Sequence, residues 1–179
     1  MTNTSAKTKN LVICAIFVAL LAICSWISIP LTVPVTMQTF AVFLCAGLLG
    51  TKRSCASIAC WIILGFIGVP VFAGFQGGPA VIFGPLGGYI LGFLISAVIV
   101  GIAAEKLGRK ASVLAVFMVI GLILCYAFGT VWFMYFYGKA AGPIRIGAAL
   151  SMCVIPFVIP DLAKIALAVF LTKRLERFV

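Results

Sequence analysis

The sequence predicts an all-α integral membrane protein, built as a single membrane domain of six transmembrane helices. Of its 179 residues, 65% are hydrophobic and 9% are charged, which leaves too little polar surface to coat a water-soluble globule. The apolar stretches are continuous, whereas the strands of a membrane β-barrel alternate polar and apolar residues in segments of about ten. Both observations favour helices that cross a bilayer.

Six stretches are long enough to cross a bilayer as helices, which takes about 20 apolar residues, or somewhat fewer where the bilayer thins. The first stretch is too long for the apolar core of a signal peptide and further spans follow it, so we expect it to be retained. A polar tail, residues 1–9, precedes one membrane domain, residues 10–179. The spans are expected at 10–29, 35–50, 54–73, 84–104, 112–137 and 147–172.

The basic residues orient these spans. Only Lys139 and Arg145 fall on one side of the expected helices, while the other side collects most of the basic residues. Since Lys and Arg accumulate in cytoplasmic loops, we expect both termini, including the tail, to be cytoplasmic and the protein to lie in the plasma membrane. The residues on the cytoplasmic side are Lys7, Lys9, Lys52, Arg53, Lys106, Arg109, Lys110, Lys173, Arg174 and Arg177.

Two connections on the outward side, 30–37 and 74–83, carry no charge. The second is rich in glycine and also contains large apolar residues such as Phe75 and Phe83, which are poorly suited to lie in water. Irregular backbone at membrane depth is tolerated where it lines a cavity, so we expect this connection to form a lid over a ligand pocket. A tight turn with a few interfacial apolar residues is the alternative.

Several classes of function are excluded. The chain has no histidine, and its seven cysteines lack the two-residue spacing of zinc or redox motifs, so no metal site, cofactor or ordinary enzyme is expected. No phosphate-cradling loop is present, so any active transport needs an energy source outside this chain. The basic residues form separate small clusters rather than one stripe, which argues against a nucleic-acid partner.

Asp161 and Lys164 are two charges inside the last apolar stretch. A spacing of three residues on a helix corresponds to about 60° of rotation and roughly 4.5 Å of rise, so both side chains project from one face. Pro156 and Pro160 should kink or restart the helix here. A charge at the centre of a membrane helix costs on the order of 3 kcal/mol. We therefore expect a binding site, with a purely structural ion pair as the alternative.

Small residues recur at helical spacing in two places. Gly84, Gly88 and Gly92 lie four residues apart, and Ala15 and Ala19 repeat this spacing on the first span. Such faces let two helix backbones approach closely. On composition alone, both sets predict helix packing.

Four stretches together resemble the successive signature motifs of the BioY family, the biotin-binding S components of energy-coupling-factor transporters. The similarity extends over nearly the whole chain, with matching order, spacing and six-span layout. Leu86 stands where the family pattern has Thr, and Pro160 where it has Gly, which puts one hydroxyl contact and the local backbone position in question. The stretches are VPVTMQT (33–39), GFIGVPVFAG (65–74), GPLGGYILGF (84–93) and PFVIPDLAK (156–164).

The resemblance implies a prokaryotic S component that captures biotin from outside and associates with a transmembrane T subunit and two cytoplasmic ATPases. Ala15 and Ala19 would then form the docking surface for the T subunit. Asp161 could accept the ureido N–H groups of biotin, and Lys164 could pair with its carboxylate. Neutral amide contacts would come from Gln38 and Gln76, and apolar walls from Trp61, Phe72, Phe75 and Tyr89.

A stand-alone proton-coupled secondary transporter of a small carboxylate or vitamin is the alternative function. In it Asp161 would change its protonation during the transport cycle, as an acid in a low-dielectric site can. The sequence shows no inverted repeat of broken helices, which weakens this alternative. A membrane-embedded enzyme would need a nucleophile, metal set or cofactor motif that the sequence does not offer.

Overall fold

The computed structural model describes residues 3–29 and 33–178. Within these ranges the regular structure is helical, apart from one short antiparallel hairpin that pairs Ser28 with Thr36 and Ile29 with Val35. The elements are α1 (Asn3–Trp26), β1 (Ser28–Ile29), β2 (Val35–Thr36), α2 (Gln38–Phe66), the 3₁₀ helix η1 (Ala73–Phe75), α3 (Pro79–Ile82), α4 (Gly87–Lys106), α5 (Ala111–Ala141), α6 (Ile146–Cys153) and α7 (Ile155–Leu175).

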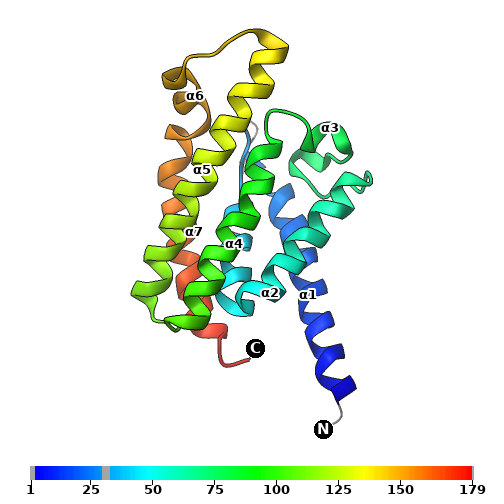
Figure 1. Ribbon diagram of the computed structural model, residues 1–179. Helices are drawn as coiled ribbons and strands as arrows, with labels where there is room; N and C mark the ends of the chain where they lie inside the picture. Colours follow the sequence, from blue (N-terminus) through cyan, green and yellow to red (C-terminus); the bar gives the residue numbers. More distant parts are fainter. Residues whose placement is uncertain (1–2, 30–32, 179) are drawn as a thin grey trace.

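The long helices form one bundle with two distinct ends (Figure 1). The beginning of α1 and the end of α7 lie at the same end, which we call the bend end because α2 bends there. The hairpin, α3 and the connection between α5 and α6 lie at the opposite end, which we call the loop end. Five helices of the described chain are long and apolar enough to cross a membrane: α1, α2, α4, α5 and α7.

Helix α2 is interrupted at Gly50, whose φ of 73° lies in the left-handed region. A side chain at this position would also collide with the carboxylate of Glu105, so both the backbone angle and the space require glycine. The chain reverses direction here, and the two halves of α2 run antiparallel (Figure 1). The predicted spans 35–50 and 54–73 fall on these two halves.

Charged side chains from α4 and the turn after it hold the bend. Arg109 donates from Nε and Nη2 to the carbonyls of Gly47 and Leu48, both at 2.9 Å. The amide and hydroxyl of Thr51 donate to the carboxylate of Glu105, at 2.7 and 3.1 Å. The cation therefore meets the carbonyl end of the first half of α2, and the anion meets the amide end of the second half, as the helix dipole favours.

The predicted helix boundaries differ most from the observed ones at the end of α2 and at the start of α1. The third predicted span runs to residue 73, but α2 ends at Phe66, because Gly68 takes a φ of 105° and Pro70 follows. Residues 67–86 instead form a connection at the loop end. Helix α1 begins at Asn3, so most of the predicted polar tail is helical. Val154 separates α6 from α7 just before Pro156, where a restart was predicted, but Pro160 lies inside the continuous helix α7.

Helices α4 and α5 pack with their backbones close together. A Cβ atom on Gly88 would collide with Trp132, and one on Gly92 would lie 2.9 Å from the Cys125 sulfur. The Ser96 hydroxyl crosses the interface to donate to the Gly121 carbonyl at 2.8 Å. Gly88 and Gly92 therefore serve helix packing, as predicted, whereas Gly84 lies in the turn before α4 and does not.

Candidate ligand-binding site

A cavity of about 360 Å³ opens at the loop end of the bundle. This volume falls within the range of about 300–1,000 Å³ that small-molecule sites occupy. The hairpin, the first turn of α2, the 67–86 connection and the helices α4, α5, α6 and α7 all contribute to its walls. Its polar lining residues are Ser28, Thr36, Gln38, Thr39, Gln76, Tyr89, Cys125, Tyr126, Cys153, Asp161 and Lys164.

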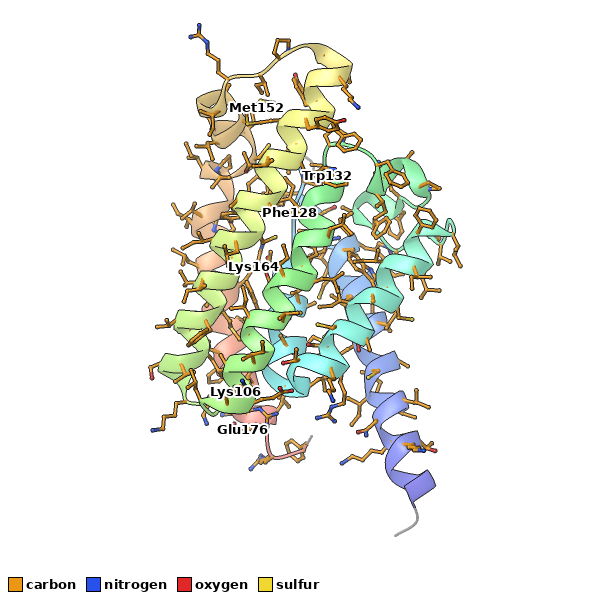
Figure 2. All side chains as sticks on the ribbon, viewed as in Figure 1. Lys106, Phe128, Trp132, Met152, Lys164 and Glu176 are labelled. Atoms are coloured by element: carbon orange, nitrogen blue, oxygen red, sulfur yellow. The ribbon has the colours of Figure 1, made fainter. Side chains whose placement is uncertain are left out.

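Asp161 and Lys164 form a buried ion pair in the wall of this cavity. Lys164 Nζ lies 2.7 Å from Asp161 Oδ1, so the spacing on α7 brings the two charges together as predicted. Thr39 donates its hydroxyl to the same oxygen at 2.9 Å, and Tyr126 donates to Oδ2 at 2.5 Å. Asp161 is 2% exposed and Lys164 is 8% exposed. In Figure 2, Lys164 lies near the middle of the bundle, well below the loop end.

The two charged groups differ in the bonding capacity that remains. The Asp161 carboxylate, with about four lone-pair sites, already accepts three hydrogen bonds from described residues. The Lys164 ammonium has three N–H donors, and one of them bonds to a described residue. Because Lys164 also lines the cavity, its two donors without a partner among the described residues suit a ligand that carries a negative charge or a strong acceptor.

Gln38 begins α2 and is held by its neighbours in a fixed orientation. Its Nε2 donates to Ser25 Oγ at 2.9 Å, and its Oε1 accepts from the Thr36 hydroxyl at 3.0 Å. Ser25 in turn donates to the Leu21 carbonyl at 2.7 Å. One amide N–H and one carbonyl lone pair of Gln38 have no partner among the described residues and are available to a ligand.

The predicted aromatic and amide residues fall into two groups. Phe72, Gln76 and Tyr89 line the cavity together with Gln38. Trp61 does not line it: this ring is fully buried and packs edge-on against Phe72 from behind, with centroids 5.1 Å apart. Phe75 is also outside the lining and is 63% exposed.

The connection predicted as a lid does cover one side of the cavity. Gly74, Gln76 and Val81 from this segment contribute to the lining. Leu86, at the position noted as a departure from the family pattern, also lines the cavity, so an apolar side chain occupies this part of the wall.

Sequence reasoning missed Thr39 and Tyr126, which bond directly to Asp161. Thr39 is the last residue of one of the four stretches that resemble the family motifs, and this position could have marked it as a site residue. Tyr126 lies in an apolar span with no pattern to distinguish it. Ala15 and Ala19, proposed for partner docking, both lie on the exposed side of α1, which packs mainly against α2 and η1.

Comparisons with known proteins show the family of this chain and agree with its fold. The model of the BioY family matches residues 1–179. The chain is 42% identical to the biotin transporter BioY of Thermotoga maritima, over 94% of this chain and 96% of that protein. It is 39% identical to the probable biotin transporter BioY of Pyrococcus horikoshii, over 95% and 98% of the two chains.

A solved structure is similar as well. The S-component for biotin from an ECF-type ABC transporter superposes with a TM-score of 0.88 at 27% identity, covering 100% of this chain and 96% of that one. The chain therefore belongs to the BioY family, as its motifs predicted, and it is a helical multi-pass membrane protein. The relatives are named as transporters, in agreement with the expectation that the chain is not an enzyme.

Proposed function

We propose that this protein is the S component of an energy-coupling-factor transporter and binds biotin at the cavity of the loop end. The observation that carries this proposal is the buried pair of Asp161 and Lys164 in the cavity wall, in which Lys164 keeps donors without a partner in the described part of the chain. A charged pair at this depth costs free energy, so its presence favours a functional role such as ligand binding. The names of the relatives supply the identity of the ligand.

The chemistry of biotin matches the cavity walls. Its carboxylate can pair with Lys164, and its ureido N–H groups can donate to the remaining lone pair of Asp161 or to the oxygen of a fixed amide such as Gln38. The thioether ring needs an apolar wall, which Phe72 and Tyr89 provide. Gln76 offers a further amide from the lid. Trp61 and Phe75 support this wall and lid from outside the cavity.

The membrane arrangement that fits this function has six spans. They are α1, the two halves of α2, α4, α5, and α6 together with α7. Both termini would be cytoplasmic in a prokaryotic plasma membrane, because the basic clusters near Lys52, Lys106 and Lys173 belong to the bend end. The cavity at the loop end would then open to the outside, where biotin is captured.

The partners that fit this function are a transmembrane T subunit and two cytoplasmic ATPases. The exposed faces of Ala15 and Ala19 support close approach of a partner helix. Tryptophan at both positions would then block energised uptake and leave biotin binding to the isolated subunit intact.

Identification of the bound ligand tests the proposed function directly. The purified protein in detergent should retain biotin in native mass spectrometry and bind added biotin in calorimetry without consuming it. Reconstituted alone in liposomes, it should show no uptake driven by a proton gradient. Uptake that follows the proton gradient would instead favour the secondary transporter, and absence of biotin binding would reject the proposal.

A further inference from the structure

All three tryptophans of the chain bond to one segment, residues 70–84 of the connection at the loop end. Each donates its indole N–H to a backbone carbonyl. Trp26 donates to Pro70 at 2.8 Å, Trp61 to Val71 at 3.1 Å, and Trp132 to Gly84 at 3.0 Å. Because these donors come from α1, α2 and α5, three separate helices hold the segment at both of its ends.

The held segment is the part of the connection that covers the cavity. Phe72, Gln76 and Val81 all lie between the outermost bonded carbonyls and all line the cavity. The position of the three indoles therefore determines where these cavity walls lie. Figure 2 shows Trp132 at the loop end, beside the start of α4.

The three attachments are not equivalent. Trp61 is fully buried, and Trp132 occupies the space that Gly88 leaves between α4 and α5, so both belong to the packed bundle. Trp26 is 37% exposed at the very end of α1 and stacks on Phe75, with ring centroids 5.1 Å apart and planes 23° apart. The attachment at Trp26 is the one at the surface.

The tip of the segment, residues 73–76, has a backbone that needs this attachment. Phe75 takes a φ of 57°, in the left-handed region that a bulky residue avoids, and Gly74 before it takes a φ of 67°. This turn directs the Phe75 ring outward onto Trp26, whereas the neighbouring Gln76 lines the cavity. One backbone conformation thus directs the Phe75 ring outward onto Trp26 and the Gln76 amide inward to the cavity.

We propose that Trp26 is a positioning residue that holds the 73–76 tip closed over the cavity through its stack on Phe75 and its bond to Pro70. Release of the stack lets the tip relax toward ordinary backbone angles and withdraws Gln76 from the lining. Trp26 thereby sets how long a bound molecule stays in the cavity. The identity of that molecule, biotin, rests on the proposed function.

The main experiment measures biotin dissociation from the purified protein and its variants. Trp26→Ala should release biotin about tenfold faster than the wild type, which corresponds to the loss of one neutral hydrogen bond and one aromatic pair. Trp26→Phe keeps a ring for stacking but loses the N–H donor, and its dissociation rate should lie between the two. Tyr135→Ala is the control, because Tyr135 is an exposed aromatic residue whose ring contacts Phe136 and Lys139 instead.

A double-mutant cycle distinguishes the effect of the Trp26–Phe75 stack from a general loosening of the fold. Phe75→Ala should also speed dissociation, and adding Trp26→Ala to it should have less effect than in the wild type, since the stack is already lost and only the bond to Pro70 remains to be removed. Fully additive effects, or equal dissociation from Trp26→Ala and Tyr135→Ala, would overturn the proposal.

A second measurement needs no ligand. Hydrogen–deuterium exchange of residues 70–78 in the free protein should be faster in Trp26→Ala and Phe75→Ala than in the wild type or Tyr135→Ala. The amides of Phe72 and Gly78, which bond to the carbonyls of Gln76 and Gly65, report this opening. If the wild type binds no biotin, the proposed function fails, while the exchange result still decides whether Trp26 holds the tip.

Discussion

Two interruptions of helices, one in each half of the bundle, use charged residues in opposite ways. At the Gly50 bend, Glu105 and Arg109 bond to backbone amides and carbonyls that the broken helix leaves unpaired. After the α6–α7 break, Lys164 bonds to Asp161, and Asp161 also accepts from Thr39 and Tyr126. Two N–H donors of Lys164 have no hydrogen-bond partner among the described residues. The difference teaches that a charge near a helix break is structural when its bonds go to backbone groups of the break, and available to a ligand when it lies in a cavity wall with donors left over among the described residues.

The largest expected effect comes from removing one member of the Asp161–Lys164 pair. Lys164→Ala and Asp161→Asn should each cost at least about 2 kcal/mol of biotin binding, about thirtyfold in affinity, because the remaining partner is left partly desolvated. Lys164→Ala should also abolish the preference for biotin over its amide analogue, whereas Asp161→Asn should largely keep it. Calorimetry in detergent measures both quantities.

Each variant needs a thermal melting curve to show that it is folded. Wild-type affinity in folded Lys164→Ala and Asp161→Asn proteins would show that this pair is structural too, and the contrast between the two interruptions would disappear.

Removal of the Arg109 contact at the Gly50 bend should lower the stability of the fold and leave the affinity for biotin unchanged. Arg109→Ala leaves the carbonyls of Gly47 and Leu48 without their charged donor and should destabilise the fold by about 2 kcal/mol. A lower melting temperature with unchanged biotin affinity in the folded protein is the expected result. A loss of affinity as large as that of Lys164→Ala would mean that the bend end takes part in the site.

A smaller effect is expected from the hydroxyl groups that hold Asp161. Tyr126→Phe removes one of its three donors and should weaken biotin binding by about 1 kcal/mol, roughly fivefold. Titration of this variant beside Lys164→Ala shows whether orientation of the carboxylate matters for the ligand. An unchanged affinity would indicate that Thr39 and Lys164 hold Asp161 without help.

The smallest effect concerns Thr172, near Gly47 at the bend end. Its hydroxyl is fully buried and is the one buried side-chain polar atom without a hydrogen-bond partner among the described residues. Thr172→Val replaces this group by an apolar one of similar shape and should raise stability by up to about 1 kcal/mol. The melting temperature should rise slightly, and a fall would show that the hydroxyl has a partner in the membrane-embedded protein.

The sequence predicted the charged pair well because both residues lie within one turn of one helix. Their spacing alone places Asp161 and Lys164 on the same face, and the structure has them in contact. Thr39 and Tyr126 could not be predicted in the same way, since they are 122 and 35 residues from Asp161 and reach it through packing of separate helices. Neither residue has a local pattern that reveals such a contact.

The connection at the loop end shows a second limit of prediction from the sequence. Composition predicted correctly that residues 74–83 would fold back onto the protein, because the segment is apolar and uncharged. It could not tell that Phe75 points outward and Gln76 inward, since that depends on the left-handed angle at Phe75, which no residue-type preference suggests for phenylalanine. The long apolar run also hid the end of α2 at Phe66, where only Gly68 and Pro70 mark the change.

The close contact of α4 with α5 determines which sequence changes the protein tolerates. A side chain larger than hydrogen at Gly88 or Gly129 would collide with Trp132 or Tyr89, so these two positions accept almost no replacement. Ile123 and Val131 lie on the outward side of α5, 58% and 70% exposed, where any apolar residue suits the surrounding lipid. In a saturation library selected for growth on scarce biotin, we therefore expect many different residues on the outward side of α5. On the side that faces α4, we expect almost no substitutions.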